Sequence, residues 1–183
     1  DEIITALKQF IQAGNQVYFQ AGNRDFVLGS KFLAQFGGKL LPEIDQLNIA
    51  RTRFRLEHGD ALCTDVIAYQ RFKKIIRHPL LLGLLKRTPL SFRKKLANGF
   101  RQQSHQAQQF KSYEVMDVND QAVELALQDV DVLIHGHTHR AAIHPLGQKK
   151  RIVLGDWKED SAEILEIQEN QDFETLKLKK WRY

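Results

Sequence analysis

Three short runs, each typical of a β-strand, end directly in glycine-containing clusters of polar residues. The runs occupy residues 16–20, 51–57 and 132–135, and the clusters that follow them are Gly22-Asn23-Arg24-Asp25, His58-Gly59-Asp60 and Gly136-His137-Thr138-His139. In open α/β folds, ligands bind where the carboxyl ends of neighbouring strands meet. This feature therefore predicts an α/β fold in which three distant segments form a single site.

Helix and strand patterns alternate around these runs. Apolar residues at helical spacing predict a first helix that ends near Gly14, and a short helix is expected from Ser30 to Gly37-Gly38. Asn119 is predicted to cap a helix that reaches about Gln128. Further strands are expected at 40–42 and 44–49, and as a terminal β-meander over 151–157, 162–168 and 173–178.

Charge is strongly segregated along the chain. Residues 66–113 contain eleven Lys and Arg and no Asp or Glu, whereas the remainder holds 16 bases and 22 acids. The net charge of +5 is therefore the sum of a strongly basic segment and an acidic remainder. Pro79 and Pro89 divide this basic, leucine-rich segment into two or three predicted helices. The single cysteine, Cys63, excludes an internal disulfide and indicates a reducing compartment, and the longest apolar stretch is too short to cross a bilayer.

The polar clusters carry donors suited to a metal ion. His137 and His139 lie two residues apart in a loop that begins with glycine, and together with His58 and the Asn23 side-chain oxygen they would form an N/O ligand set appropriate to Mn, Fe or Zn. The alternative is that these are ordinary loop residues without a metal. In that case Arg24-Asp25 would be a plain loop ion pair, worth at most about 1 kcal/mol.

The clusters resemble motif blocks of the calcineurin-like metallophosphoesterases, which are D-x-H, G-D-x-x-D, G-N-H-D/E, a lone H and G-H-x-H. Residues 22–25, His58 and residues 136–139 match the last three blocks, with Arg24 in place of the usual His. This departure and the strings HGDALCTD, AYQRF, MDVN and LIHGHTHR make the chain similar, over essentially its whole length, to the UDP-2,3-diacylglucosamine pyrophosphatase family of lipid A biosynthesis. The resemblance implies a β-sandwich flanked by helices (αββα) with a helical cap insertion.

The resemblance also implies two divalent metal ions, expected to be Mn²⁺, and water attack on the α-phosphorus of UDP-2,3-diacylglucosamine, which gives UMP and 2,3-diacylglucosamine 1-phosphate. Asn23, His58 and His137 would bind the second metal, and His139 would help to bind the first. The residues implied to take part directly in catalysis are Arg24, Asp25 and His137. Arg24 would face the phosphate, and Asp25 would orient the Arg24 side chain.

By the same resemblance, the chain divides into a first part of the core (1–65), a basic cap for the lipid (66–113) and a second part of the core (114–183). The residues implied to contact the substrate are Asn23, Arg24, Tyr69, Arg101, Ser104, Gln108, Lys111 and His137. Gln108 stands where the family usually has Asn, and Val66 where it usually has an Asp that contacts the sugar. The cap would place a monomeric enzyme on the cytoplasmic face of the inner membrane as a peripheral protein. Alternatively, its leucines are simply a hairpin core and its basic face is solvated.

The first two blocks do not occur in the sequence, and residue 1 is not Met. We therefore expect an N-terminally truncated chain that is inactive alone and binds at most one metal weakly. Two other functions remain open: another metallophosphoesterase, such as a nucleotide phosphatase or nuclease, and a basic nucleic-acid-binding module. Because the basic segment has few aromatic residues and many leucines, it favours a lipid partner and no nucleic acid.

Overall fold

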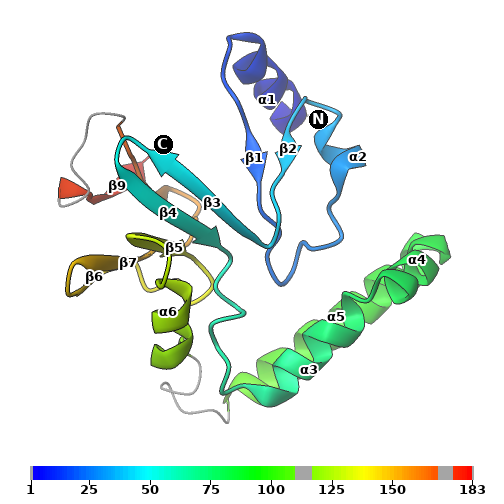
Figure 1. Cartoon of the computed structure of the whole chain (residues 1–183). Helices are drawn as coiled ribbons and strands as arrows, with labels where there is room; N and C mark the ends of the chain where they lie inside the picture. Colours follow the sequence, from blue (N-terminus) through cyan, green and yellow to red (C-terminus); the bar gives the residue numbers. More distant parts are fainter. Residues whose placement is uncertain (1, 110–116, 169–174, 183) are drawn as a thin grey trace.

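The computed structural model describes residues 2–109, 117–168 and 175–182. A five-stranded mixed sheet lies at the centre of the molecule, with strand order β3-β4-β5-β7-β6 (Figure 1). Strands β4, β5 and β7 run parallel, and the hairpins β3-β4 and β6-β7 are antiparallel. The bounds of the strands are β3 (Ile44–Ile49), β4 (Thr52–Glu57), β5 (Val132–His135), β6 (Ala142–Leu146) and β7 (Lys149–Val153). The parallel centre confirms the α/β class.

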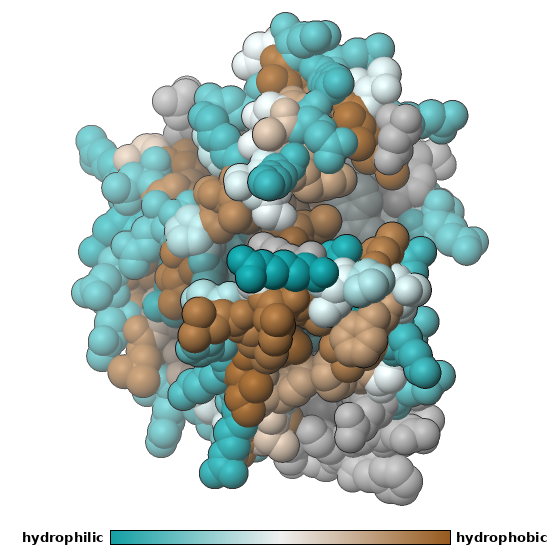
Figure 2. All heavy atoms as spheres, turned by 90° about the vertical axis from the view of Figure 1, so that its right-hand side faces the viewer, coloured by the Kyte–Doolittle hydropathy of each residue, from teal (hydrophilic) through white to brown (hydrophobic). Residues whose placement is uncertain are grey.

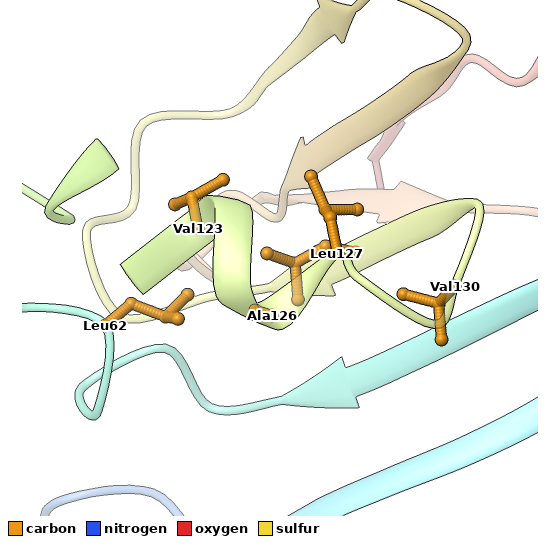
Figure 3. Packing of buried hydrophobic residues seen from close by; sticks show 6 residues of the cluster. Leu62, Val123, Ala126, Leu127 and Val130 are labelled. Carbon is orange, nitrogen blue, oxygen red and sulfur yellow. The ribbon is translucent and has the colours of Figure 1, made fainter. Parts of the chain in front are cut away.

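Both faces of the sheet are covered, which explains why all four residues of β5 are buried. Leu133 packs in a buried cluster with Val123 of helix α6 (Asp120–Ala126) and with Leu127 at the end of this helix. Figure 3 shows Val123, Ala126 and Leu127 of this cluster. The neighbours of Leu133 in the strand, Val132 and Ile134, point to the other face, as the two-residue period of a strand requires. There they join a second core cluster with partly buried side chains of a two-stranded sheet, formed by β8 (Ser161–Leu165) and β9 (Leu178–Arg182).

The N-terminal part of the chain forms a separate unit of small elements (Figure 1). It comprises α1 (Glu2–Gln12), β1 (Tyr18–Phe19), α2 (Ser30–Leu33) and β2 (Lys39–Leu40), with β1 parallel to β2. The predicted end of the first helix is confirmed, because Gly14 has a φ of +92°. The Gln20 side-chain amide donates to the Leu56 carbonyl at 3.0 Å and ties this unit to the central sheet.

The basic segment forms the three helices α3 (Ile67–Ile76), α4 (Pro79–Arg87) and α5 (Leu90–Gln109), which extend away from the sheet (Figure 1). The predicted breaks at Pro79 and Pro89 are confirmed. Helices α3 and α5 contact each other through Phe72 and Phe100, whose ring centroids are 5.0 Å apart. Among the helices that the structure describes, none has both the length and the apolarity needed to cross a membrane.

The predicted terminal meander is wrong in its connections. Strand β7 joins the central sheet beside β5, and Trp157 instead forms an isolated bridge with Ala162 of β8. Strand β6, which contains His144 and Pro145, was not predicted. Proline removes a ladder donor and is tolerated at the edge of a sheet, which is the position of β6. The expected strand over 173–178 lies partly outside the described residues, and β9 begins later.

Candidate active site

The parallel strands β4 and β5 end side by side, with Glu57 paired to His135. The residues that follow these two strands remain in contact, since the Gly136 amide donates to the His58 carbonyl at 3.1 Å. The rings of His58 and His137 consequently meet edge to face, with centroids 5.0 Å apart. The structure thus brings two of the three predicted polar clusters together at the carboxyl edge of the sheet.

The first cluster reaches the same place through Gly22, which is buried. A Cβ atom at this position would lie 2.8 Å from both Cδ2 and Nε2 of His58, so only glycine allows the loop to approach the ring this closely. Asp25 shapes the loop by accepting the Gly22 N–H at 2.5 Å. Arg24 is exposed and makes no ion pair with Asp25 among the described residues. The loop ion pair considered from the sequence is therefore not formed.

The loop after β5 has an uncommon backbone. His137 and His139 have φ values of 65° and 56°, a left-handed region that non-glycine residues enter uncommonly. The ring of Tyr69 stacks on His137 at a centroid distance of 6.4 Å. Burial, reinforced by nearby His58, lowers the pKa of His137 to about 4, so its imidazole is neutral at pH 7, as a metal ligand must be. His139 is exposed.

Two buried groups beside these loops were not singled out from the sequence. His135, the last residue of β5, is only 1 % exposed, and its Nε2 atom has no hydrogen-bond partner among the described residues. Burial lowers the pKa of His135 to about 4. Asp60 is equally buried, and Tyr69 donates its hydroxyl hydrogen to it at 2.6 Å. The string LIHGHTH contains His135 and the motif HGD contains Asp60, but sequence spacing cannot show that either side chain is buried.

The donors on these loops are nitrogen and amide oxygen atoms, which fit a divalent transition metal such as Mn²⁺ or Zn²⁺. Within the described ranges, no three His, Cys, Asp or Glu side chains lie together as a set that could hold a metal ion. The observed donors are the two histidines, His58 and His137, with half-buried Asn23 following Gly22 on the adjoining loop. The residues present therefore fit one side of a metal site.

The remaining predicted contacts lie on the cap. Tyr69 belongs to α3, where its ring faces His137 and its hydroxyl group is held by Asp60. Arg101, Ser104 and Gln108 lie in α5, but their side chains are outside the part of the chain that the structure describes in detail. Lys111 is outside the described residues altogether.

No family model matches the chain. It is nevertheless 41% identical over 173 residues to a UDP-2,3-diacylglucosamine hydrolase from Haemophilus influenzae, which covers 93% of this chain and 73% of the relative. A relative of the same name from Serratia proteamaculans is 44% identical over 169 residues, covering 89% of this chain and 70% of the other. A third, from Pseudomonas paraeruginosa, is 42% identical over 161 residues, covering 85% and 67%.

Among solved structures, an archaeal phosphodiesterase aligns with 98% of this chain and 76% of its own, at a TM-score of 0.46 and 13% identity. Vacuolar protein sorting 29 from Cryptosporidium parvum aligns with 100% of this chain and 76% of its own, at a TM-score of 0.43 and 12% identity. The family follows from the curated relatives, because their identity exceeds 40% over most of both chains. The chain belongs to the UDP-2,3-diacylglucosamine hydrolase family.

Proposed function

We propose that this protein hydrolyses the diphosphate bond of UDP-2,3-diacylglucosamine in a metal-dependent reaction, releasing UMP and 2,3-diacylglucosamine 1-phosphate. The proposal rests on the meeting of His58, His137 and the Gly22-Asn23 loop at one edge of the sheet. The names of the curated relatives support the choice of substrate.

His58, His137 and Asn23 are the residues that would hold a metal ion. Divalent ions supply two kinds of chemistry to such a site, activation of water and neutralisation of charge on the phosphoryl oxygens. The chain itself contributes neutral imidazole from His137, because burial keeps this ring deprotonated. His139, exposed on the same loop, remains a predicted ligand of a second ion.

In the proposed reaction, Arg24 contacts the phosphate groups of the substrate. It is exposed beside Asn23 and no described residue forms an ion pair with it, so its guanidinium group is available to a substrate. The planar fork of arginine donates two parallel hydrogen bonds to phosphoryl oxygens, which fixes the orientation of the diphosphate. Asp25 supports this role indirectly, because it holds the loop through the Gly22 amide.

The cap has the role of the lipid site. Several of its large apolar side chains are exposed, and Figure 2 shows apolar surface on the side of the molecule where α4 lies. They are Ile67, Phe72, Ile75, Leu80, Leu84, Leu90 and Phe92. Such a surface would receive acyl chains and would hold the protein at the cytoplasmic face of the inner membrane. Tyr69, Arg101, Ser104, Gln108 and Lys111 stay predicted substrate contacts on this side.

The test measures Mn²⁺-dependent release of UMP from UDP-2,3-diacylglucosamine. Because D-x-H and G-D-x-x-D do not occur in residues 1–183, the protein is assayed both alone and with a segment that carries these blocks placed ahead of residue 1. In the protein that carries the added segment, we expect His137→Ala to abolish the activity. His78→Ala, which replaces an exposed histidine in the cap, should leave the activity unchanged. Hydrolysis of simple nucleotides in preference to the lipid would contradict the proposal.

A further inference from the structure

Asp60 is a buried carboxylate for which the proposed reaction has no role. Only 1 % of its surface is exposed, and it follows directly after His58-Gly59. Both of its oxygens are in contact with cations or donors from the first cap helix. Tyr69 Oη donates to Oδ2 at 2.6 Å, Arg77 Nη2 donates to Oδ2 at 3.5 Å, and Lys73 Nζ donates to Oδ1 at 3.2 Å.

The spacing of these donors explains how one helix supplies them all. Tyr69 and Lys73 are one helical turn apart on α3, and Arg77 follows after the next turn as the residue that ends the helix. Lys73 and Arg77 are mostly buried, with side-chain exposures of 11% and 18%. Two cations at low exposure beside one carboxylate indicate a structural contact and exclude a solvated basic face at this part of the helix.

His58 lies on the other side of the carboxylate. Its Nδ1 atom is buried and lies 3.1 Å from Oδ1 of Asp60, although this contact does not have the geometry of a hydrogen bond and Nδ1 has no other hydrogen-bond partner among the described residues. Its Cδ2–Nε2 edge packs against Gly22. A carboxylate beside Nδ1 favours the tautomer that carries hydrogen on Nδ1, which leaves the lone pair of Nε2 directed toward the Gly22-Asn23 loop.

The same helix also holds the loop that carries Asn23. Arg77 Nη2 donates to the Gly22 carbonyl at 3.1 Å, and Glu43 accepts from Arg77 at 3.0 Å and forms an ion pair with Lys73. Gln70, which follows Tyr69 in the sequence, also contacts the His58 loop, because its side-chain amide donates to the Asp60 carbonyl at 2.8 Å. Helix α3 therefore contacts the loops that carry Asn23 and His58, in addition to the ring of His137 on the third loop.

We propose that Asp60 is a positioning residue that sets the tautomer and orientation of His58 for metal binding and links them to the polar face of helix α3. The inference rests on the proposed function, because it takes His58 as a metal ligand. It assigns the cap a second role besides contact with the lipid: Tyr69, Lys73 and Arg77 hold the His58 loop in place.

The test compares Asp60→Asn with Asp131→Asn. Both carboxylates contact arginine, but Asp131 pairs with Arg53 at the opposite end of β4 and β5. Mn²⁺ binding is followed by electron paramagnetic resonance of the free ion, and the tautomer of His58 is read by ¹⁵N NMR of the metal-free protein. We expect Asp60→Asn to weaken Mn²⁺ binding by about ten- to a hundredfold and to shift His58 away from the Nδ1–H form, with Asp131→Asn changing neither.

A smaller change in the same direction is expected for Tyr69→Phe, which keeps the ring next to His137 and removes only the hydrogen bond to Asp60. If Asp60→Asn does not fold, the same two measurements on Tyr69→Phe decide the test. Normal Mn²⁺ affinity together with an unchanged His58 signal in both variants would overturn the inference. Absence of Mn²⁺ binding even by the protein with the D-x-H and G-D-x-x-D blocks placed ahead of residue 1 would instead contradict the proposed function, while the NMR comparison would still decide the role of Asp60.

Discussion

At the scale of single residues, the contact between Gly22 and His58 is a sterically demanding feature of the site. We predict that Gly22→Ala displaces His58, because the added Cβ would lie 2.8 Å from two ring atoms. Mn²⁺ affinity measured by calorimetry should fall at least tenfold, by analogy with the loss of groups that orient a ligand. Gly29→Ala in the same connection is the control, since a Cβ there meets nothing within 4 Å. Equal affinities of the two variants would contradict the prediction.

We predict that the stability of the metal-free protein depends on pH through its two buried histidines, His135 and His137. In the unfolded chain their pKa is the ordinary 6.5, and in the folded protein burial lowers the pKa values of His135 and His137 to about 4. Between these values the unfolded chain binds more protons, so the free energy of unfolding decreases as pH falls from 6.5 to 4. Each histidine contributes at most about 1.4 kcal/mol per pH unit.

Urea denaturation at several pH values between 4 and 7 measures this slope. His137→Asn should reduce it, and the exposed control His78→Gln should not. An unchanged slope in His137→Asn would show that this ring is not shielded from water. Asp60 should stay ionised throughout this pH range: although burial opposes ionisation, contacts with His58, Tyr69 and Lys73 hold the pKa of this carboxyl well below its usual range.

At the scale of elements, the sequence and the structure differ most on the cap helices. The run without acidic residues indicated a basic face for an anionic membrane, but two of its cations, Lys73 and Arg77, are paired with Asp60 and Glu43 from outside the run. Arg71 and Lys74 of the same helix are exposed. Charge segregation along a sequence therefore does not mean segregation in space, because ion pairs form between distant segments.

The exposed leucines of α4 give a test of the cap as a lipid surface. Leu80 and Leu84, one turn apart, are 79% and 63% exposed. We predict that the double substitution Leu80→Ser/Leu84→Ser weakens binding to vesicles containing anionic lipid by roughly tenfold or more, because each buried leucine contributes about 1.5–3 kcal/mol. Co-sedimentation with vesicles measures this effect, and Leu125→Ser, at a 63% exposed position on α6, is the control. Undiminished binding by the double variant would assign these leucines to another partner.

At the scale of the whole molecule, helix α6 and the β8-β9 sheet hold the central sheet between them. Leu133 is completely buried in the cluster under α6, whereas Leu125 on the outer side of the helix is 63% exposed. We predict that Leu133→Ala lowers the free energy of unfolding by about 2–5 kcal/mol, as expected for a leucine cavity in a core. Leu125→Ala should change it by no more than about 0.5 kcal/mol. Chemical denaturation distinguishes the two, and equal effects would mean that α6 is not packed on the sheet.

The sequence alone determined the order of the main helices and strands and the residue types at the strand ends. Local rules are sufficient for this, because turns, caps and periodic apolar positions depend on neighbours in the chain, as Gly14 and Asn119 show. Asn119 indeed caps α6 by accepting the Ala122 amide hydrogen. The loops with His58 and His137 could be found for the same reason, since they follow directly after well-marked strands.

Only the tertiary structure decided which distant groups touch. The place of β7 in the central sheet, the burial of His135 and the contacts of Asp60 with helix α3 all depend on segments that are far apart in the chain. Burial changes the free energy of a charge or a hydrogen bond, and no local pattern encodes it. The residue types of the candidate site were therefore present in the sequence, but the contacts that orient them were fixed by packing.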